Sequence, residues 1–269
     1  MKSFPAFGIL LASRSRRDAL LSLLEKNSGL PGPRANLELM YSFAKAVSSL
    51  KLQEWQWELI LWMAAISPSK APVNTPREYL TVCGVAALGA LYAGGLPRPR
   101  RRAALAAIRK AASDSRWRTR EAAAIALQII GEQDLDALRG IVDAWSTDAS
   151  MLEQRAIVAG LAHPPILKDG AFSLFCLEVS RGILSSLSRL DTAARRDDDF
   201  RVLRQGLGYA ISVFVEKSPG EGFSLLREVA VRKDTDIHWI VRETLKKKRL
   251  SANYPDEVKR VSDLLVRNA

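Results

Sequence analysis

The feature that most limits how this chain can fold is helical periodicity along nearly its whole length. Apolar residues recur at intervals of three and four, as on one face of an α-helix, and no segment alternates convincingly like a strand. Short stretches with turn-forming residues separate the periodic segments. We therefore expect an all-α protein. The expected helices span residues 14–27, 37–50, 53–66, 76–93, 98–113, 117–130, 134–146, 150–161, 169–188, 198–217, 220–233, 236–249 and 255–268.

Capping signals support several of these helix starts. The segment TPRE at Thr75 offers an N-cap hydroxyl, a proline at the first helical position and a glutamate two positions later. The segment YPDE before Val258 also places proline and acidic residues in a first turn. So many helices with short connections exceed a simple bundle. We expect antiparallel hairpins stacked side by side.

One short motif occurs twice. DSRWRTRE begins at Asp114 and DIHWIVRE begins at Asp236, with Asp, Trp, Arg and Glu at identical spacing. In each copy the aspartate ends a helix, and the arginine six positions later lies inside the next helix. Asp198 and Arg204 repeat that step. An arginine near a helix start is poorly placed for the macrodipole, so an aspartate partner is expected. The motif predicts a repeated structural turn.

Two longer segments carry a family resemblance. SDSRWRTREAAAIAL and DTDIHWIVRETL resemble the inter-helix turn and second helix of a HEAT repeat. In that family the aspartate caps the turn and pairs with arginines of the same or the adjacent repeat. The resemblance implies such a ladder here. Its members would be Asp114, Arg120, Asp198, Arg204, Asp236 and Arg242.

The resemblance also implies an architecture, namely a right-handed α-solenoid superhelix of HEAT-like helical hairpins. We expect one domain over residues 1–269. The repeats are clearest over 97–250, whereas 1–96 form divergent N-terminal helices and 251–269 form a C-terminal capping helix. A HEAT-like pattern specifies architecture strongly and function hardly at all.

Positive charge gathers next to the first copy of the motif. The formal net charge is +11, and Arg98 to Arg120 hold nine arginines and lysines against one acid. Such a field attracts phosphates or acidic proteins, although a solvated basic surface is the alternative. Basic residues interleaved with an aromatic suit a nucleic-acid groove. The candidate nucleic-acid-binding residues are Arg102, Arg109, Arg116, Arg118, Trp117, Trp239, Lys246, Lys247 and Lys248.

The tryptophans admit two interpretations. Trp117 and Trp239 lie in the first turn of second helices, which line the concave face of HEAT superhelices. They either pack against a neighbouring repeat or provide a platform on which a ligand stacks. Trp55 and Trp62 are seven residues apart, which predicts one buried stripe.

The sequence offers little catalytic chemistry. Of its two histidines, His163 precedes two prolines at a helix boundary. His238, next to Trp239, could reach a cleft, but we expect it on the surface. No cluster has metal-ligand spacing, and no phosphate-binding loop follows a strand. Cys83 and Cys176 are expected to be buried free thiols in a reducing compartment. We therefore expect no catalytic residue, no metal and no cofactor.

Two apolar segments bear on location. Phe4 to Ala12 is short and runs into SRSRR without a convincing cleavage site, although an organelle-targeting start stays open. Tyr79 to Leu96 carries no charge but is rich in glycine and alanine, so we expect a helix buried by its neighbours rather than a membrane span. We expect a cytoplasmic protein that does not enter a membrane.

These observations favour a non-enzymatic binding or scaffold module that holds a partner protein or nucleic acid on a basic concave face. The alternative is a more distant resemblance to bacterial DNA glycosylases that excise alkylated purines, a family built from HEAT-like repeats. AWSTD, Ala144 to Asp148, distantly resembles that family's tryptophan-then-aspartate stretch. The spacing and surrounding residues depart from the family pattern. Asp148 also has a structural explanation, because Asp148 and Arg155 repeat the aspartate-to-arginine step of the turn with one extra residue. No catalytic residue is carried over.

Overall fold

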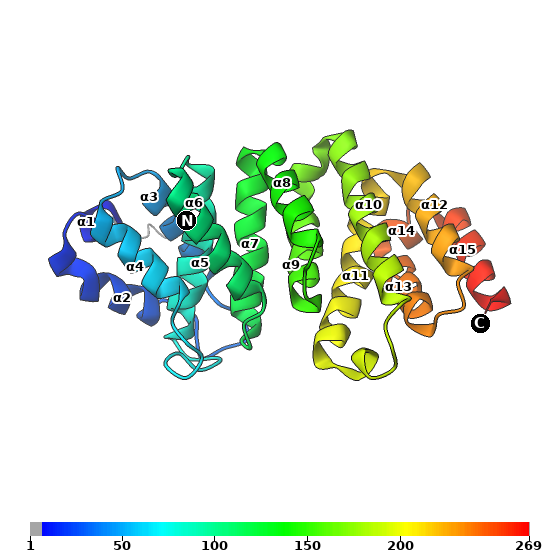
Figure 1. Ribbon diagram of the computed structural model, residues 1–269, viewed down its shortest axis with the longest axis horizontal. Helices are drawn as coiled ribbons and strands as arrows, with labels where there is room; N and C mark the ends of the chain where they lie inside the picture. Colours follow the sequence, from blue (N-terminus) through cyan, green and yellow to red (C-terminus); the bar gives the residue numbers. More distant parts are fainter. Residues whose placement is uncertain (1–6, 269) are drawn as a thin grey trace. The chain divides into compact units, whose positions relative to one another are not determined.

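The computed structural model describes residues 7–268, whose regular elements are all helices and which contain no strand (Figure 1). The chain divides into two compact units, Met1–Leu138 and Arg139–Ala269, and the division falls inside α8 (Leu135–Ser146). The first unit contains α1 (Phe7–Leu11), α2 (Arg17–Lys26), α3 (Leu37–Ser48), α4 (Glu54–Ala64), α5 (Glu78–Ala93), α6 (Arg98–Ala112) and α7 (Trp117–Gln133). The second contains α9 (Met151–Leu161), α10 (Gly170–Leu187), α11 (Asp198–Lys217), α12 (Pro219–Ala230), α13 (Thr235–Leu245), α14 (Lys248–Ser251) and α15 (Pro255–Arg267).

The all-α prediction is confirmed, and each expected helix has a counterpart. The expected helix over 236–249 is wrong in one respect. It is interrupted between α13 and α14 because Lys247 has an extended backbone with ψ of 128°. Neither glycine nor proline marks that break in the sequence. Of the apolar stretch Phe4–Ala12, Phe7–Leu11 form α1, and Phe4 to Ala6 lie outside the described residues.

The first unit is built around α5. Every residue from Glu78 to Tyr92 is buried, and α5 packs against α3, α4, α6 and α7. Two glycines allow this close packing. A Cβ atom on Gly84 would lie 2.5 Å from the backbone nitrogen of Ala64, and one on Gly89 would lie 2.7 Å from Cα of Ala126. The prediction that this uncharged segment is a helix buried by its neighbours is confirmed.

Each unit has two layers of helices. In the first unit α3, α5 and α7 are neighbours in one layer, and α4 and α6 pack on the other side of α5. In the second unit α9, α11 and α13 form one layer, and α10, α12 and α15 form the other. Within each unit, these consecutive helices therefore alternate between the two layers.

The predicted buried stripe of Trp55 and Trp62 is wrong. The buried face of α4 runs through Trp57, Ile60 and Met63, at the three-residue spacing of one helix face. Trp62 lies off that face with 36% of its surface exposed, and the guanidinium of Arg17 lies 4.7 Å from its ring. The spacing of seven places Trp55 and Trp62 on one face of α4, but that face is not the buried one.

Two further predictions concern burial. Cys83 and Cys176 are free and buried, as expected, and burial raises the pKa of both thiols. Among the described residues, α10 alone is long and apolar enough to cross a membrane, by length and composition only. This is a weak indication, because the core helix of a soluble protein passes the same test. Glu178 and Arg181, within α10, form an ion pair at 3.2 Å.

Candidate functional site

Trp117, the first residue of α7, lies on the surface, with 46% of its area exposed. Its ring is covered on one side by the guanidinium of Arg118, 4.3 Å from the ring centroid. An aromatic ring with this much exposed area can serve as an anchor for a binding partner. Trp117 is therefore accessible to solvent, and its use as a stacking platform stays a prediction.

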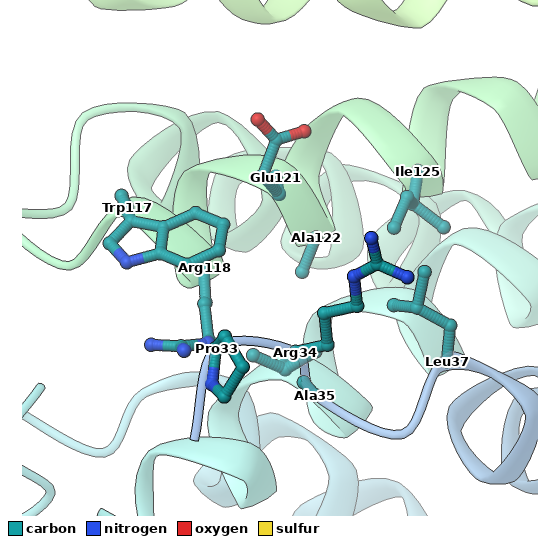
Figure 2. A pocket seen from close by; sticks show the side chains of 10 residues that line it. Pro33, Arg34, Ala35, Leu37, Trp117, Arg118, Glu121, Ala122 and Ile125 are labelled. Atoms are coloured by element: carbon teal, nitrogen blue, oxygen red, sulfur yellow. The ribbon is translucent and has the colours of Figure 1, made fainter. Parts of the chain in front are cut away.

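Trp117 stands at the edge of a pocket of about 300 Å³ (Figure 2). Glu121 and Ile125 of α7 continue that side, and residues 33–37 form the opposite side, where Leu37 is 49% exposed. The guanidinium of Arg34 extends between the two sides in Figure 2, and no described residue pairs with it. The pocket is therefore mostly apolar, with one available cation at its rim.

This pocket lies between α3, α5 and α7, since Leu37, Val82 and Trp117 all line it. A second hollow, of about 510 Å³, lies between the same three helices. It is lined by Tyr41 and Lys45 of α3, by Ala90 of α5 and by Glu132 of α7. We call the two hollows together the α5 groove, with α3 and α7 as its walls and the small residues of α5 as its floor. Burial raises the pKa of Tyr41, and the negative charge of Glu132, which lines the same hollow, raises it further.

A buried ion pair fixes the loop that forms one end of the groove. Arg118 is only 6% exposed, pairs with Glu78 at 3.6 Å and donates to the carbonyl of Gly32 at 2.6 Å. Glu78 in turn accepts from the backbone N–H of Asn74 at 2.7 Å, and the side-chain oxygen of Asn74 accepts from the N–H of Gly32 at 3.0 Å. Arg118 therefore holds the loop at one end of the groove in place, and its guanidinium is not a surface group available to phosphate.

Arg116 has a similar internal role. It is 2% exposed, and its guanidinium contacts both carboxylate oxygens of Asp114 at 2.8 and 2.7 Å. It also donates to the carbonyls of Ala71 at 3.1 Å and Ile66 at 2.8 Å. Asp114 at this turn therefore forms an ion pair with Arg116, two residues later. Arg120 donates to the backbone carbonyl of Asp114 at 2.7 Å.

The arginines predicted to bind phosphate therefore fall into a buried group and a group on α6. Arg116 and Arg118 are buried and engaged, whereas Arg102 is exposed and no described residue pairs with it. Arg102 and the half-buried Arg109 lie on α6. Helix α6 packs against α5 and α7, and neither arginine lines the pocket beside Trp117. Sequence distance alone had suggested one basic surface.

In the second unit the aspartate of the motif pairs with a neighbouring hairpin. Asp236 forms ion pairs with Arg204 of α11 and with Arg195, the latter at 2.9 Å. Asp198 is 83% exposed and pairs with Arg201 at 2.9 Å, so it does not hold Arg204. Arg242 is exposed and has no partner among the described residues. In the second unit the aspartate and the arginine six residues later therefore mark a turn, but they do not form an ion pair with each other.

The remaining candidates of this unit differ from one another. Trp239 is half-buried, with the guanidinium of Arg204 at 4.4 Å from its ring, so it packs against α11. Lys246 pairs with Glu243 at 2.6 Å, and Lys247 is half-buried. His238 is 4% exposed, so its prediction as a surface residue is wrong. It lies on the inner side of α13, between the buried Ile237 and the half-buried Trp239.

No group of three or more metal-ligating side chains occurs within residues 7–268. Trp145, the tryptophan of the AWSTD stretch, is 5% exposed and unavailable for stacking on a base. A scan of protein-family models and a search of curated proteins found no match to this chain. The α5 groove was missed in the sequence, although Leu37, Tyr41 and Lys45 recur at helical spacing and include two apolar residues that the structure leaves exposed.

Proposed function

We propose that the chain is a non-enzymatic binding module of HEAT-like hairpins, which continue as a right-handed solenoid, and that the α5 groove holds an α-helical segment of a partner protein. The exposure of Trp117 carries this proposal, supported by Leu37 and Tyr41 on the opposite wall, which are 49% and 42% exposed. Burying exposed apolar area of this kind drives the binding of an amphipathic helix in a groove.

The size of the groove suits a short helix. The α3 wall runs from Leu37 to Ser48, about three turns of helix, or about 17 Å at 1.5 Å per residue. A ligand helix of similar length would present apolar residues at positions i, i+4 and i+7 to the floor of small α5 residues. Trp117 would cover one end of that apolar stripe.

Charge specifies one flank of the ligand. Arg34 and Lys45 both belong to the α3 side of the groove, and neither has a partner among the described residues. A helix with acidic side chains along the flank that faces α3 would pair with both cations. Rim charges of this kind add more to specificity and association rate than to affinity.

The test is a selection from a library of amphipathic helical peptides randomised at both flanks. We expect enrichment of acidic residues on one flank, and loss of that preference in the double variant Arg34→Glu/Lys45→Glu. Trp117→Ala should weaken the selected peptide about thirty-fold, the loss of an aromatic anchor worth about 2 kcal/mol. Val73→Ala, at an exposed apolar residue outside the groove, is the control, with 54% exposure. Selected peptides that bind Trp117→Ala as tightly as the parent would refute the groove.

A second candidate function rests on a separate observation. Arg98 and Arg102 lie one turn apart on α6, are exposed, and have no partner among the described residues. We propose that they contact nucleic-acid phosphates. In titrations of duplex DNA against salt, Arg98→Ala/Arg102→Ala should flatten the slope of log K by about two relative to the parent. Lys51→Ala/Lys70→Ala, at two exposed lysines outside α6, is the control. Equal slopes in all three proteins would remove this candidate.

A further inference from the structure

The second unit has a pocket of its own, of about 390 Å³, between the start of α13 and the end of α15. Three cationic side chains, Lys233, Arg242 and Arg267, line it. All three are exposed, and none has an ion-pair partner among the described residues. Elsewhere on α12 and α15, by contrast, Arg227 and Arg260 share the carboxylate of Glu257.

The carboxylate in the pocket wall does not neutralise these cations. Both oxygens of Asp234 bind Arg195, at 2.9 and 2.7 Å, and one of them also accepts the N–H groups of Asp236 and Ile237. Burial alone would raise the pKa of Asp234, but these hydrogen bonds and the charge of Arg195 hold it below its usual value. Asp234 is thus an ionised group already paired with a cation, and the pocket keeps an excess of positive charge.

Hydrogen-bond donors accompany the charge. Thr235 is the first residue of α13, and neither its backbone N–H nor its hydroxyl has a partner within residues 7–268. His238, one turn further along α13, lines the same pocket, is 4% exposed, and has a buried Nε2 atom without a hydrogen-bond partner. A buried polar atom without a hydrogen-bond partner costs stability. An oxyanion beside His238 would accept the hydrogen bond from Nε2 that no described residue accepts.

We propose that this pocket binds a phosphate group, either as inorganic phosphate or as the monoester of a small molecule. Two guanidinium groups and an ammonium group match the charge and the oxygens of a phosphate dianion better than those of a carboxylate. The helix N-terminus at Thr235 contributes a positive dipole end to the same place. The site is independent of the α5 groove and does not depend on the function proposed for it.

The test uses the full chain and its two histidines as reporters. Inorganic phosphate, phenyl phosphate, sulfate and acetate are titrated at constant ionic strength while the imidazole resonances of His238 and His163 are followed. We expect both phosphates to shift His238 saturably, with His163, outside the pocket, unchanged. The monoester binding more tightly would identify a small-molecule site, and equal affinities would identify a site for the free anion.

Variants separate specific binding from general attraction by a basic protein. Arg242→Gln/Arg267→Gln should weaken phosphate at least tenfold, and Arg196→Gln, at another exposed arginine of this unit, should leave its affinity unchanged. Equal weak shifts with phosphate, sulfate and acetate would overturn the proposal. Undiminished phosphate affinity in the double variant would overturn it as well. Because Arg242 and Arg267 are exposed, the double variant is expected to fold.

Discussion

Replacing Arg116 with alanine should be among the most destabilising single changes in the first unit. The guanidinium joins three segments that are far apart in the sequence. It binds the carboxylate of Asp114 beside it, the carbonyls of Ile66 and Ala71 after α4, and the hydroxyl of Thr81 in α5, the last at 3.3 Å. The substitution removes all of these contacts at once from a site where the arginine is 2% exposed.

The magnitude follows from what is left behind. Asp114, with 14% of its side chain exposed, would become a nearly buried charge without a cation, and two buried carbonyls would lose their donor. Removing one member of a buried ion pair typically costs about 3–5 kcal/mol. Against a typical stability of about 5–15 kcal/mol for a folded protein, such a loss is a large fraction of the total.

The assay is urea denaturation followed by circular dichroism and by tryptophan fluorescence, since four of the six tryptophans belong to the first unit. Arg116→Ala should move the transition of that unit to a much lower urea concentration. Arg98→Ala, at an exposed arginine without a partner among the described residues, should change stability by no more than about 0.5 kcal/mol. If the two variants unfold at the same urea concentration, Arg116 does not hold these segments together.

Two further outcomes are expected. Gly89→Ala should destabilise the protein despite alanine's higher helix propensity, because the new Cβ would lie 2.7 Å from Cα of Ala126. Gly140→Ala is the control, since it has open space around it and should stabilise α8 by up to about 1 kcal/mol. The two melting temperatures are compared with that of the parent protein. Asp234→Asn should lower the melting temperature at neutral pH, and the deficit should shrink as pH falls below about 4. The folded state lowers the pKa of Asp234, so its contribution is present above the unfolded pKa and lost as pH falls through the folded one; a deficit independent of pH would contradict this.

The helices were predictable because their signals are local. Apolar spacing identified every long helix, and the absence of charge from Tyr79 onward identified α5 as buried. The N-cap predicted at Thr75 is wrong, because α5 begins at Glu78 after Arg77, and the Thr75 hydroxyl instead donates to the carbonyl of Pro72 at 2.7 Å. The break at Lys247 was not predictable, since no glycine or proline accompanies it. The single domain and the solenoid superhelix stay predictions, because the two compact units each show only their own layers.

The candidate sites depended on contacts that the sequence does not encode locally. Arg116 and Arg118 look like surface residues in a basic segment, but their partners, Ile66 and Gly32, come from loops far upstream. Asp236 likewise takes its arginines from a preceding hairpin rather than from its own helix. Motif spacing finds a turn reliably, whereas the partner of a charged side chain is decided by the packing of the chain around it.

The burial of α5 has a consequence for biosynthesis. A nascent chain that has passed Ala93 but has not yet made α6 and α7 exposes part of an apolar helix that carries no charge after Glu78. At ribosomal speeds of about 5–20 residues per second this interval lasts seconds, long enough for chaperone capture or self-association. A message truncated before Trp117 should therefore yield an insoluble product.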